Sequence, residues 1–185
     1  MEFLLMALEN GVVPWRYQWP ADMTPEQLYN VESFLAVEKK PARSTCESPN
    51  YGRANLIVAA TKADIRYCVW PVAYYCIDGD YIRMPAIGHF PFERDFHETR
   101  FHELAHWAQR GGADAKGELV AEIGACFMLA RLNLPTSDDL ENHTKHLDSW
   151  LACMRQDPTW IGGVLLEVNR VADFIFSFSN PLELG

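Results

Sequence analysis

The chain has 185 residues, of which 49% are hydrophobic, enough to enclose one substantial core in a single domain. Its formal net charge of -9 would repel a phosphate backbone, so direct binding of nucleic acid is not expected. No run approaches the roughly 20 apolar residues of a membrane span, and the first residues lack the basic start of a signal peptide. The five cysteines include no C-x-x-C pair, which argues against a disulfide framework and predicts a reducing, cytoplasmic setting with no membrane partner.

The N-terminal segment is the least regular part of the sequence. A short helix is predicted over residues 3–10, but Gly11 and Pro14 interrupt the pattern, and a polar stretch follows. The chain is therefore divided into an N-terminal segment, residues 1–55, and one domain, residues 56–185.

The next part of the chain predicts a helix and a small sheet. The apolar run NLIVAATKAD at residues 55–64 favours a helix, although so short a run also fits a buried strand. IRYCVWPVAYYCIDG and DYIRMP are rich in aromatic and β-branched residues, and the pair Asp78-Gly79 predicts a turn between two short strands. We expect a small mixed or antiparallel sheet, with DYIRMP as a candidate edge strand to which an extended peptide could add.

The second half of the chain has the periodicity of helices. DFHETRFHELAHWAQR, residues 95–110, contains neither Pro nor Gly and predicts a helix that Gly111 and Gly112 end. Further helices are predicted over residues 116–132, 140–154 and 159–176. A few strands followed by a run of helices indicate an α+β domain, with the sheet packed on the first long helix and a helical subdomain after it.

The first long helix carries an H-E-x-x-H pattern. His102 and His106 are four residues apart and therefore project from one face, as two ligands of one zinc ion do. Glu103 lies between them, where this pattern places the group that takes a proton from zinc-bound water. The bare pattern also occurs by chance, so the prediction of a catalytic Zn2+ site depends on a further ligand.

The next helix offers that ligand. Glu118 and Glu122 are also four residues apart and share a face. A catalytic zinc ion takes three protein ligands and keeps one open position, and a carboxylate often completes a histidine pair. We predict Glu118 as the third ligand and Glu122 as the acceptor for the free ring N–H of a ligand histidine, although the spacing allows the two roles to be exchanged. A solvated pair of glutamates is the alternative, against which the apolar residues around them argue.

Other candidate site residues have weaker patterns. His143 and His146 fall in the third predicted helix and are candidate catalytic residues that would stabilise the oxyanion of a tetrahedral intermediate. An exposed polar face explains the same two residues equally well. His97 falls off the ligand face and is expected to be structural or exposed. Tyr74, Tyr75 and Tyr81 near the predicted sheet could hold a substrate, but aromatic residues in strands more often simply pack.

Several segments together resemble a known family. HELAHW, followed by GELVAEIGACF and HLDSWL, resembles the metallopeptidase domain of ArdC-type antirestriction proteins and their polyvalent-protein relatives. DYIRMP and VADFIF also resemble that domain, so the resemblance covers about residues 60–178. It implies a zincin-like fold, zinc held by His102, His106 and Glu118, and Glu103 as the catalytic acid/base.

The resemblance is weaker outside these segments. LENGVVPWRYQW resembles the opening of the N-terminal domain that ArdC-type proteins carry, which is associated with single-stranded DNA binding. Residues 1–55 are too few for that whole domain and would be a remnant of a DNA-binding region. The chain also departs from the family at the Gly111-Gly112 linker and at His146, where an aromatic residue is more typical. These departures bear on the choice of substrate rather than on the metal.

Three functions of different classes follow. The first is a cytoplasmic, gluzincin-like zinc metallopeptidase that acts on a protein or peptide substrate. By analogy with its relatives, it would serve in antirestriction or mobile-element biology, and a phage or plasmid protein of this kind would act in the cytoplasm of the host. The second is a non-catalytic antirestriction or inhibitor protein with a structural zinc and an acidic surface that mimics DNA. The third is a nucleic-acid-binding module, whose affinity would fall steeply with salt. Replacing Glu103 with Gln separates the first two, because it removes hydrolysis and leaves binding.

Overall fold

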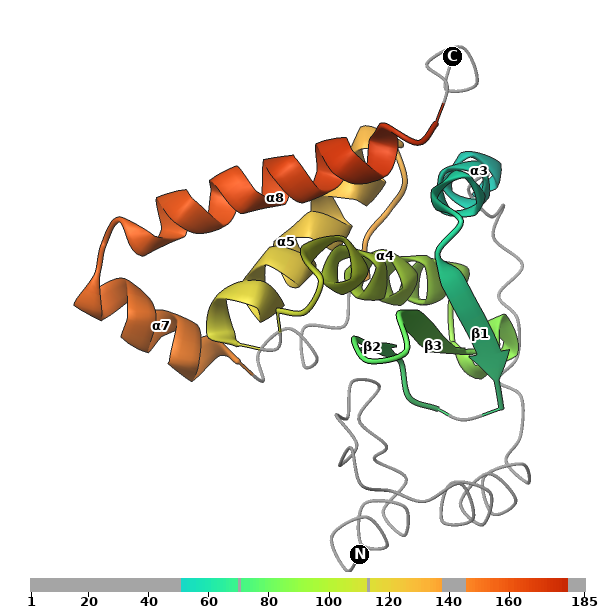
Figure 1. Cartoon of the computed structure of the whole chain (residues 1–185), viewed down its shortest axis with the longest axis horizontal. Coiled ribbons are helices and arrows are strands. Elements are labelled where there is room, and N and C mark those ends of the chain that lie inside the picture. Colours follow the sequence, from blue (N-terminus) through green and yellow to red (C-terminus); the bar gives the residue numbers. More distant parts are fainter. Residues whose placement is uncertain (1–50, 70, 113, 138–145, 180–185) are drawn as a thin grey trace, which may run out of the picture.

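The computed structural model describes residues 51–69, 71–112, 114–137 and 146–179 (Figure 1). The helix predicted over residues 3–10 lies outside these ranges. Within them, no helix combines the length and the hydropathy needed to cross a membrane. The elements in chain order are α3 Gly52–Thr61, β1 Asp64–Cys68, β2 Tyr74–Cys76, β3 Tyr81–Pro85, the 3-10 turn η1 Ile87–His89, α4 Glu93–Gln109, α5 Ala115–Arg131, α7 Leu147–Gln156 and α8 Trp160–Phe176.

The sheet has three strands in the order β1-β3-β2. β2 and β3 form the predicted antiparallel hairpin, and Asp80 in its turn has a left-handed backbone with φ 45°. β1 runs parallel to β3, with Asp64 opposite Tyr81 and Cys68 opposite Pro85. The prediction that DYIRMP is an edge strand is therefore wrong: β1 pairs with the other side of β3, which makes β3 the central strand and, among the described residues, leaves β2 and β1 at the edges.

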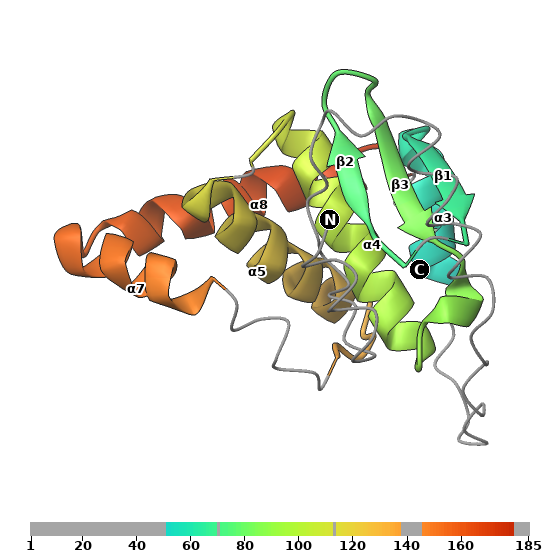
Figure 2. The same cartoon turned by 90° about the horizontal axis from the view of Figure 1, so that it is seen from below.

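Helix α4 lies between the sheet and helices α5 and α8 (Figures 1 and 2). Ile82 and Met84 of β3 are 0% exposed and face the core, because side chains alternate along a strand. On α4, Phe101 and Leu104 are also 0% exposed. The helix that carries the H-E-x-x-H pattern is thus packed on both sides, which holds its backbone rigidly.

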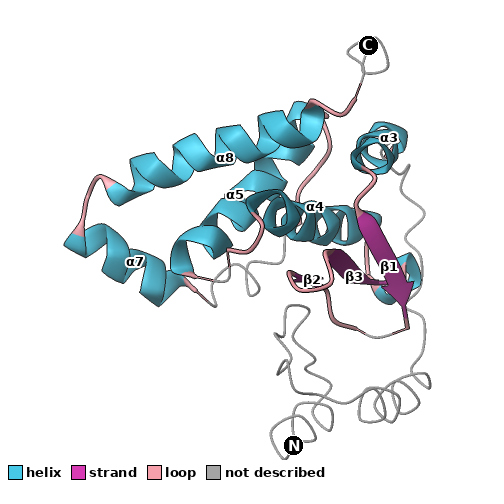
Figure 3. Ribbon diagram, in the orientation of Figure 1, coloured by secondary structure: helices cyan, strands magenta, loops and turns pink. Residues whose placement is uncertain are grey.

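Helices α5 and α8 cover the other side of α4. The buried residues of α8 recur every three or four positions and form one stripe: Val164, Val168, Val171, Ala172 and Ile175. The strands lie together on one side of α4, and α5 and α8 lie on the other (Figure 3). This arrangement is the α+β architecture that the order of the predicted elements indicated.

Most predicted helices are confirmed, and one is placed differently. The helix predicted over residues 140–154 is described only from Leu147, and it continues to Gln156. Trp150 is the buried residue of α7. His146 stands at its N-cap with a non-helical backbone, not inside the helix as predicted, and His143 lies outside the described residues.

Candidate metal centre

The two histidines of α4 converge on one point. The side chains of His102 and His106 are buried, with 2% and 7% of each residue exposed. Their Nε2 atoms are 3.0 Å apart. In a tetrahedral zinc site, two nitrogen ligands lie about 3.3 Å from each other, as follows from a metal–nitrogen distance of about 2.05 Å. The histidine pair therefore has a separation suited to a shared cation.

The backbone after α4 fixes the tautomer of His106. Nδ1 of His106 lies 3.1 Å from the carbonyl oxygen of Gly111. A carbonyl only accepts hydrogen bonds, so Nδ1 must carry the proton and donate it. Nε2 of His106 is then left with a lone pair directed at the shared point, which is the form that a metal ligand requires.

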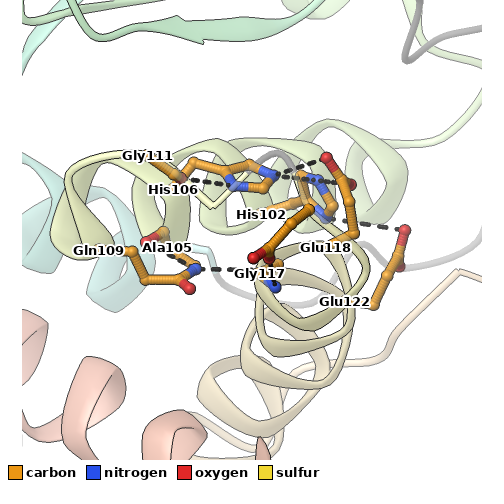
Figure 4. Close-up of polar contacts among 9 residues, drawn as sticks. His102, Ala105, His106, Gln109, Gly111, Gly117, Glu118 and Glu122 are labelled. Carbon is orange, nitrogen blue, oxygen red and sulfur yellow. Dashed lines mark hydrogen bonds and ion pairs between the residues drawn. The ribbon is translucent and has the colours of Figure 1, made fainter. Parts of the chain in front are cut away.

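Helix α5 brings a carboxylate to the same point (Figure 4). Oε2 of Glu118 is 3.7 Å from Nε2 of His102, and its Oε1 is 3.7 Å from Nε2 of His106. One ligand atom from each of the three residues lies within 4.8 Å of the others, and no other group of this kind occurs in the described ranges. Two imidazoles and one carboxylate are the donor set of a catalytic zinc site.

Glu122 occupies a different position from Glu118. Its Oε1 lies 3.7 Å from Nδ1 of His102, on the edge of the imidazole away from the shared point (Figure 4). Of the two assignments that the spacing allowed, the geometry favours Glu118 as the ligand and Glu122 as the group that orients His102.

The charges around His106 favour a cation. Burial lowers the pKa of His106, but its interaction with the carboxylate of Glu118 at 3.7 Å and the negative charge of Glu103 outweigh this effect and raise the pKa above its ordinary value. Carboxylates that stabilise a proton on this ring would also stabilise a divalent cation bound to it. The residues present therefore fit a metal ion by both geometry and charge.

Glu103 is a buried carboxylate on the same helix as the two histidines. It is 3% exposed, and its charge is close enough to act on His106. A carboxylate that is buried in this way is costly unless it is paired or serves a function. Its place on α4 between the two histidines is the one that proton transfer to or from a water on the cation would need.

The remaining predicted site residues lie elsewhere or outside the description. His146 is half-buried, its ring centroid is 5.8 Å from that of Trp150, and it is not part of the converging group. His143 falls in the range that is not described. His97 is buried and stacks on Tyr51 with ring centroids 4.2 Å apart, so it is structural, one of its two predicted environments.

The tyrosines of the sheet contact other residues of the sheet and its turn. The hydroxyl oxygens of Tyr74 and Tyr81 lie 3.5 Å apart, and the hydroxyl of Tyr75 donates to Asp80 at 3.0 Å. These contacts favour packing over substrate binding as the role of the three tyrosines.

Two buried charged residues of α4 were not singled out in the sequence. Glu98 is 2% exposed and accepts a hydrogen bond from the backbone N–H of Ser137 at 2.5 Å. Arg100 is 5% exposed and donates to Asn55 and to Nδ1 of His97, each at 2.8 Å. Nothing in their spacing distinguishes them from solvated residues, because their partners lie on other elements.

Two solved structures resemble this one. They are the Mn(II)-bound and metal-free forms of the antirestriction protein ArdC from plasmid R388. The Mn(II)-bound form has a TM-score of 0.62 and 30% sequence identity, covering 76% of this chain and 57% of that one. The metal-free form has a TM-score of 0.62 and 31% identity, covering 74% and 53%. This chain thus spans little more than half the length of the ArdC chain.

The sequence is also similar to a much larger protein. It is 30% identical to a DNA primase TraC of Escherichia coli over 139 residues, which are 68% of this chain and 13% of that protein. A second TraC of the same species is 28% identical over 139 residues, 10% of its length. The similarity is therefore to one part of TraC.

The match to a protein family covers most of the described domain. Residues 52–162 match the zincin-like metallopeptidase family. This range contains α4 and α5 with the converging histidines and glutamates, and it is more than half of the chain. The resemblance to ArdC-type proteins and the zincin-like α+β fold are thereby confirmed, and the chain belongs to the zincin-like metallopeptidase family.

Proposed function

We propose that this chain is a zinc-dependent peptidase whose catalytic site is formed by α4 and the first turn of α5. The observation that carries the proposal is the convergence of His102, His106 and Glu118 beside the buried Glu103. Three protein ligands leave a further position for water, which distinguishes a catalytic zinc site from a structural one with four protein ligands.

Zinc is the metal that this donor set suits best. Two neutral imidazoles and one carboxylate in a compact site are typical of zinc, whereas manganese more often takes several oxygen ligands. The Mn(II)-bound form of ArdC supports the binding of a divalent cation in this family. When bound, the cation would supply the Lewis acidity that polarises the peptide carbonyl and lowers the pKa of water toward about 7.

Glu103 would move the proton. Its carboxylate accepts a proton from the attacking water and then delivers it to the amine nitrogen of the leaving peptide. His102 and His106 keep their positions during these transfers, because the carbonyl of Gly111 holds one ring and Glu122 orients the other. The protein thereby places the base and the ligands before the substrate arrives.

The edge of the sheet suggests how a substrate would bind. In the part of the chain that the structure describes, β2 is an edge strand, and it contacts α4. An extended peptide can add to such an edge through main-chain hydrogen bonds, which would bring its backbone close to the metal centre. In this interpretation the peptide adds to β2, and not to the strand DYIRMP as predicted from the sequence.

The test combines metal content with hydrolysis. Wild type and Glu103→Gln, each loaded with zinc, are incubated with a library of unstructured peptides, and new termini are identified by mass spectrometry. We expect cleavage by wild type only, with equal zinc in both proteins. Cleavage by Glu103→Gln at the wild-type rate, or none by zinc-loaded wild type, would contradict the proposal.

A second candidate function is antirestriction. It is supported by the similarity to ArdC over 76% of this chain, at 30% identity. The test is the efficiency with which unmodified DNA enters a restricting bacterial host that expresses wild type or Glu103→Gln. Protection by both proteins favours a binding mechanism, protection by wild type alone favours hydrolysis, and protection by neither removes the candidate.

A further inference from the structure

The connection between α4 and α5 is tightly packed against a ligand histidine. Arg110, Gly111 and Gly112 have φ values of 58°, 142° and 87°, so the backbone reverses within a few residues. The N–H of Gly111 donates to the carbonyl of His106 at 3.1 Å, and the carbonyl of Gly111 accepts from its ring, also at 3.1 Å. Gly111 thus contacts both the backbone and the side chain of His106.

Gly117, in the first turn of α5, lies directly against the backbone of Gly112 in this linker. A Cβ built on Gly117 would lie 2.2 Å from the Cα of Gly112 and 2.2 Å from its carbonyl oxygen. No side chain fits at that distance, and backbone atoms cannot turn aside as a flexible side chain does. Any residue larger than glycine at position 117 must therefore shift α5 and the linker relative to each other.

Gln109 connects the same two helices. Its side-chain amide nitrogen is 3.3 Å from the carbonyl of Ala105 on α4 and 3.5 Å from the carbonyl of Gly117 on α5 (Figure 4). Its Oε1 would be 3.1 Å from a Cβ on Gly112, so the side chain fills the space beside the linker. The glutamine therefore spans the gap between the end of one helix and the start of the other.

These contacts stand directly beside Glu118. Its two carboxylate oxygens each lie 3.7 Å from Nε2 of one of the two histidines. Glu118 directly follows Gly117 in the sequence. Metal–ligand distances vary within about 0.2 Å, so a displacement of α5 by an ångström would take the carboxylate out of reach. We propose that Gly117 and Gln109 are positioning residues that set the distance between Glu118 and the histidine pair, an inference that rests on the proposed metal site.

The chain offers a matched control for the test. Gly124 lies on the same helix, and a Cβ there would meet only Cβ of Ala105 at 3.8 Å, an ordinary contact. Gly117→Ala and Gly124→Ala are therefore the same chemical change on one helix, with and without the backbone collision. Zinc affinity is measured by competition with a chromophoric chelator, and cobalt-substituted protein gives an absorption spectrum that reports the ligand set.

The expected result is specific to position 117. Gly117→Ala weakens zinc binding by about 10- to 100-fold, the range found for residues that orient metal ligands, and alters the cobalt spectrum. Gly124→Ala keeps the wild-type affinity and spectrum. Wild-type affinity in Gly117→Ala would overturn the inference, whereas wild type that binds no zinc would overturn the proposed function itself.

Two further variants separate positioning from general damage. Gln109→Ala leaves the backbone contact intact and is expected to weaken zinc binding by several-fold, which keeps the inference testable if Gly117→Ala does not fold. In a Glu118→Ala background, Gln109→Ala should cause little further loss, because the residue that it positions is already gone. An undiminished loss in that background would show that Gln109 acts by another route and would overturn its assigned role.

Discussion

Glu122 and His102 meet on the edge of the imidazole that faces away from the histidine pair, with Oε1 of Glu122 3.7 Å from Nδ1. A carboxylate in this position holds the ring and makes its other nitrogen a better ligand. Glu122→Gln should therefore weaken zinc affinity by about tenfold, and Glu122→Ala should weaken it further. The proton transfer assigned to Glu103 should be unchanged in both variants. Chelator competition gives the affinities. Equal affinity in all three proteins would mean that Glu122 does not orient the ligand.

Glu103→Gln should remove hydrolysis and keep the metal. Loss of a general base typically costs about 10²- to 10⁴-fold in rate, and glutamine preserves the shape of the side chain. The rate of cleavage of a peptide found in the library screen is compared between the two zinc-loaded proteins. His106→Ala is the control, because it should lose both the metal and the activity.

Acid should destabilise the fold through His97. Burial, with a smaller contribution from the charge of Arg100, lowers the pKa of His97 from 6.5 to about 3. The unfolded chain takes up a proton near pH 6.5 and the folded chain does not, so stability is highest above that pH and is lost as the pH falls toward 3. Between pH 6.5 and pH 4 this should amount to on the order of 2–3 kcal/mol.

The measurement for His97 is urea unfolding of the metal-free protein at several pH values. The metal is removed so that pH-dependent metal binding by the ligand histidines does not contribute to the measured stability. His97→Gln loses the stacking on Tyr51 and should be less stable at pH 7, but its stability should fall less steeply with acid. An unchanged slope in the variant would assign the acid sensitivity to other groups.

Asp114 should stabilise the start of α5. Its Oδ1 accepts the backbone N–H of Gly117 at 2.7 Å, as an N-cap residue does. Asp114→Ala is expected to lower the free energy of unfolding by about 1 kcal/mol, and Asp114→Asn by less because asparagine retains the acceptor. Urea titration of the three proteins checks this order, and a loss in Asp114→Asn as large as that in Asp114→Ala would assign the stabilisation to charge instead.

The parts of the structure that follow from local sequence could be predicted. A helix of residues 95–110 follows from its periodicity, and its end follows from Gly111 and Gly112. The shared face of His102 and His106 follows from helix geometry alone. Because these relationships join residues a few positions apart, no knowledge of the rest of the chain is needed.

The features that depend on distant residues could not be predicted. The central place of β3 results from parallel pairing with β1, and nothing in DYIRMP indicates on which side a partner lies. Burial of Arg100 depends on Asn55, which is 45 positions away. The sequence shows both Gly112 and Gly117, but their contact depends on how two helices meet, so the role of Gly117 could not be predicted.

Zinc content is the measurement that tests the metal centre most directly. Wild type, His106→Ala and Glu118→Ala are purified, supplied with zinc, dialysed and assayed by elemental analysis. The geometry predicts one zinc ion per wild-type chain, loss of zinc in His106→Ala and weakened retention in Glu118→Ala. Zinc-free wild type, or equal zinc in all three proteins, would contradict a centre built from these residues.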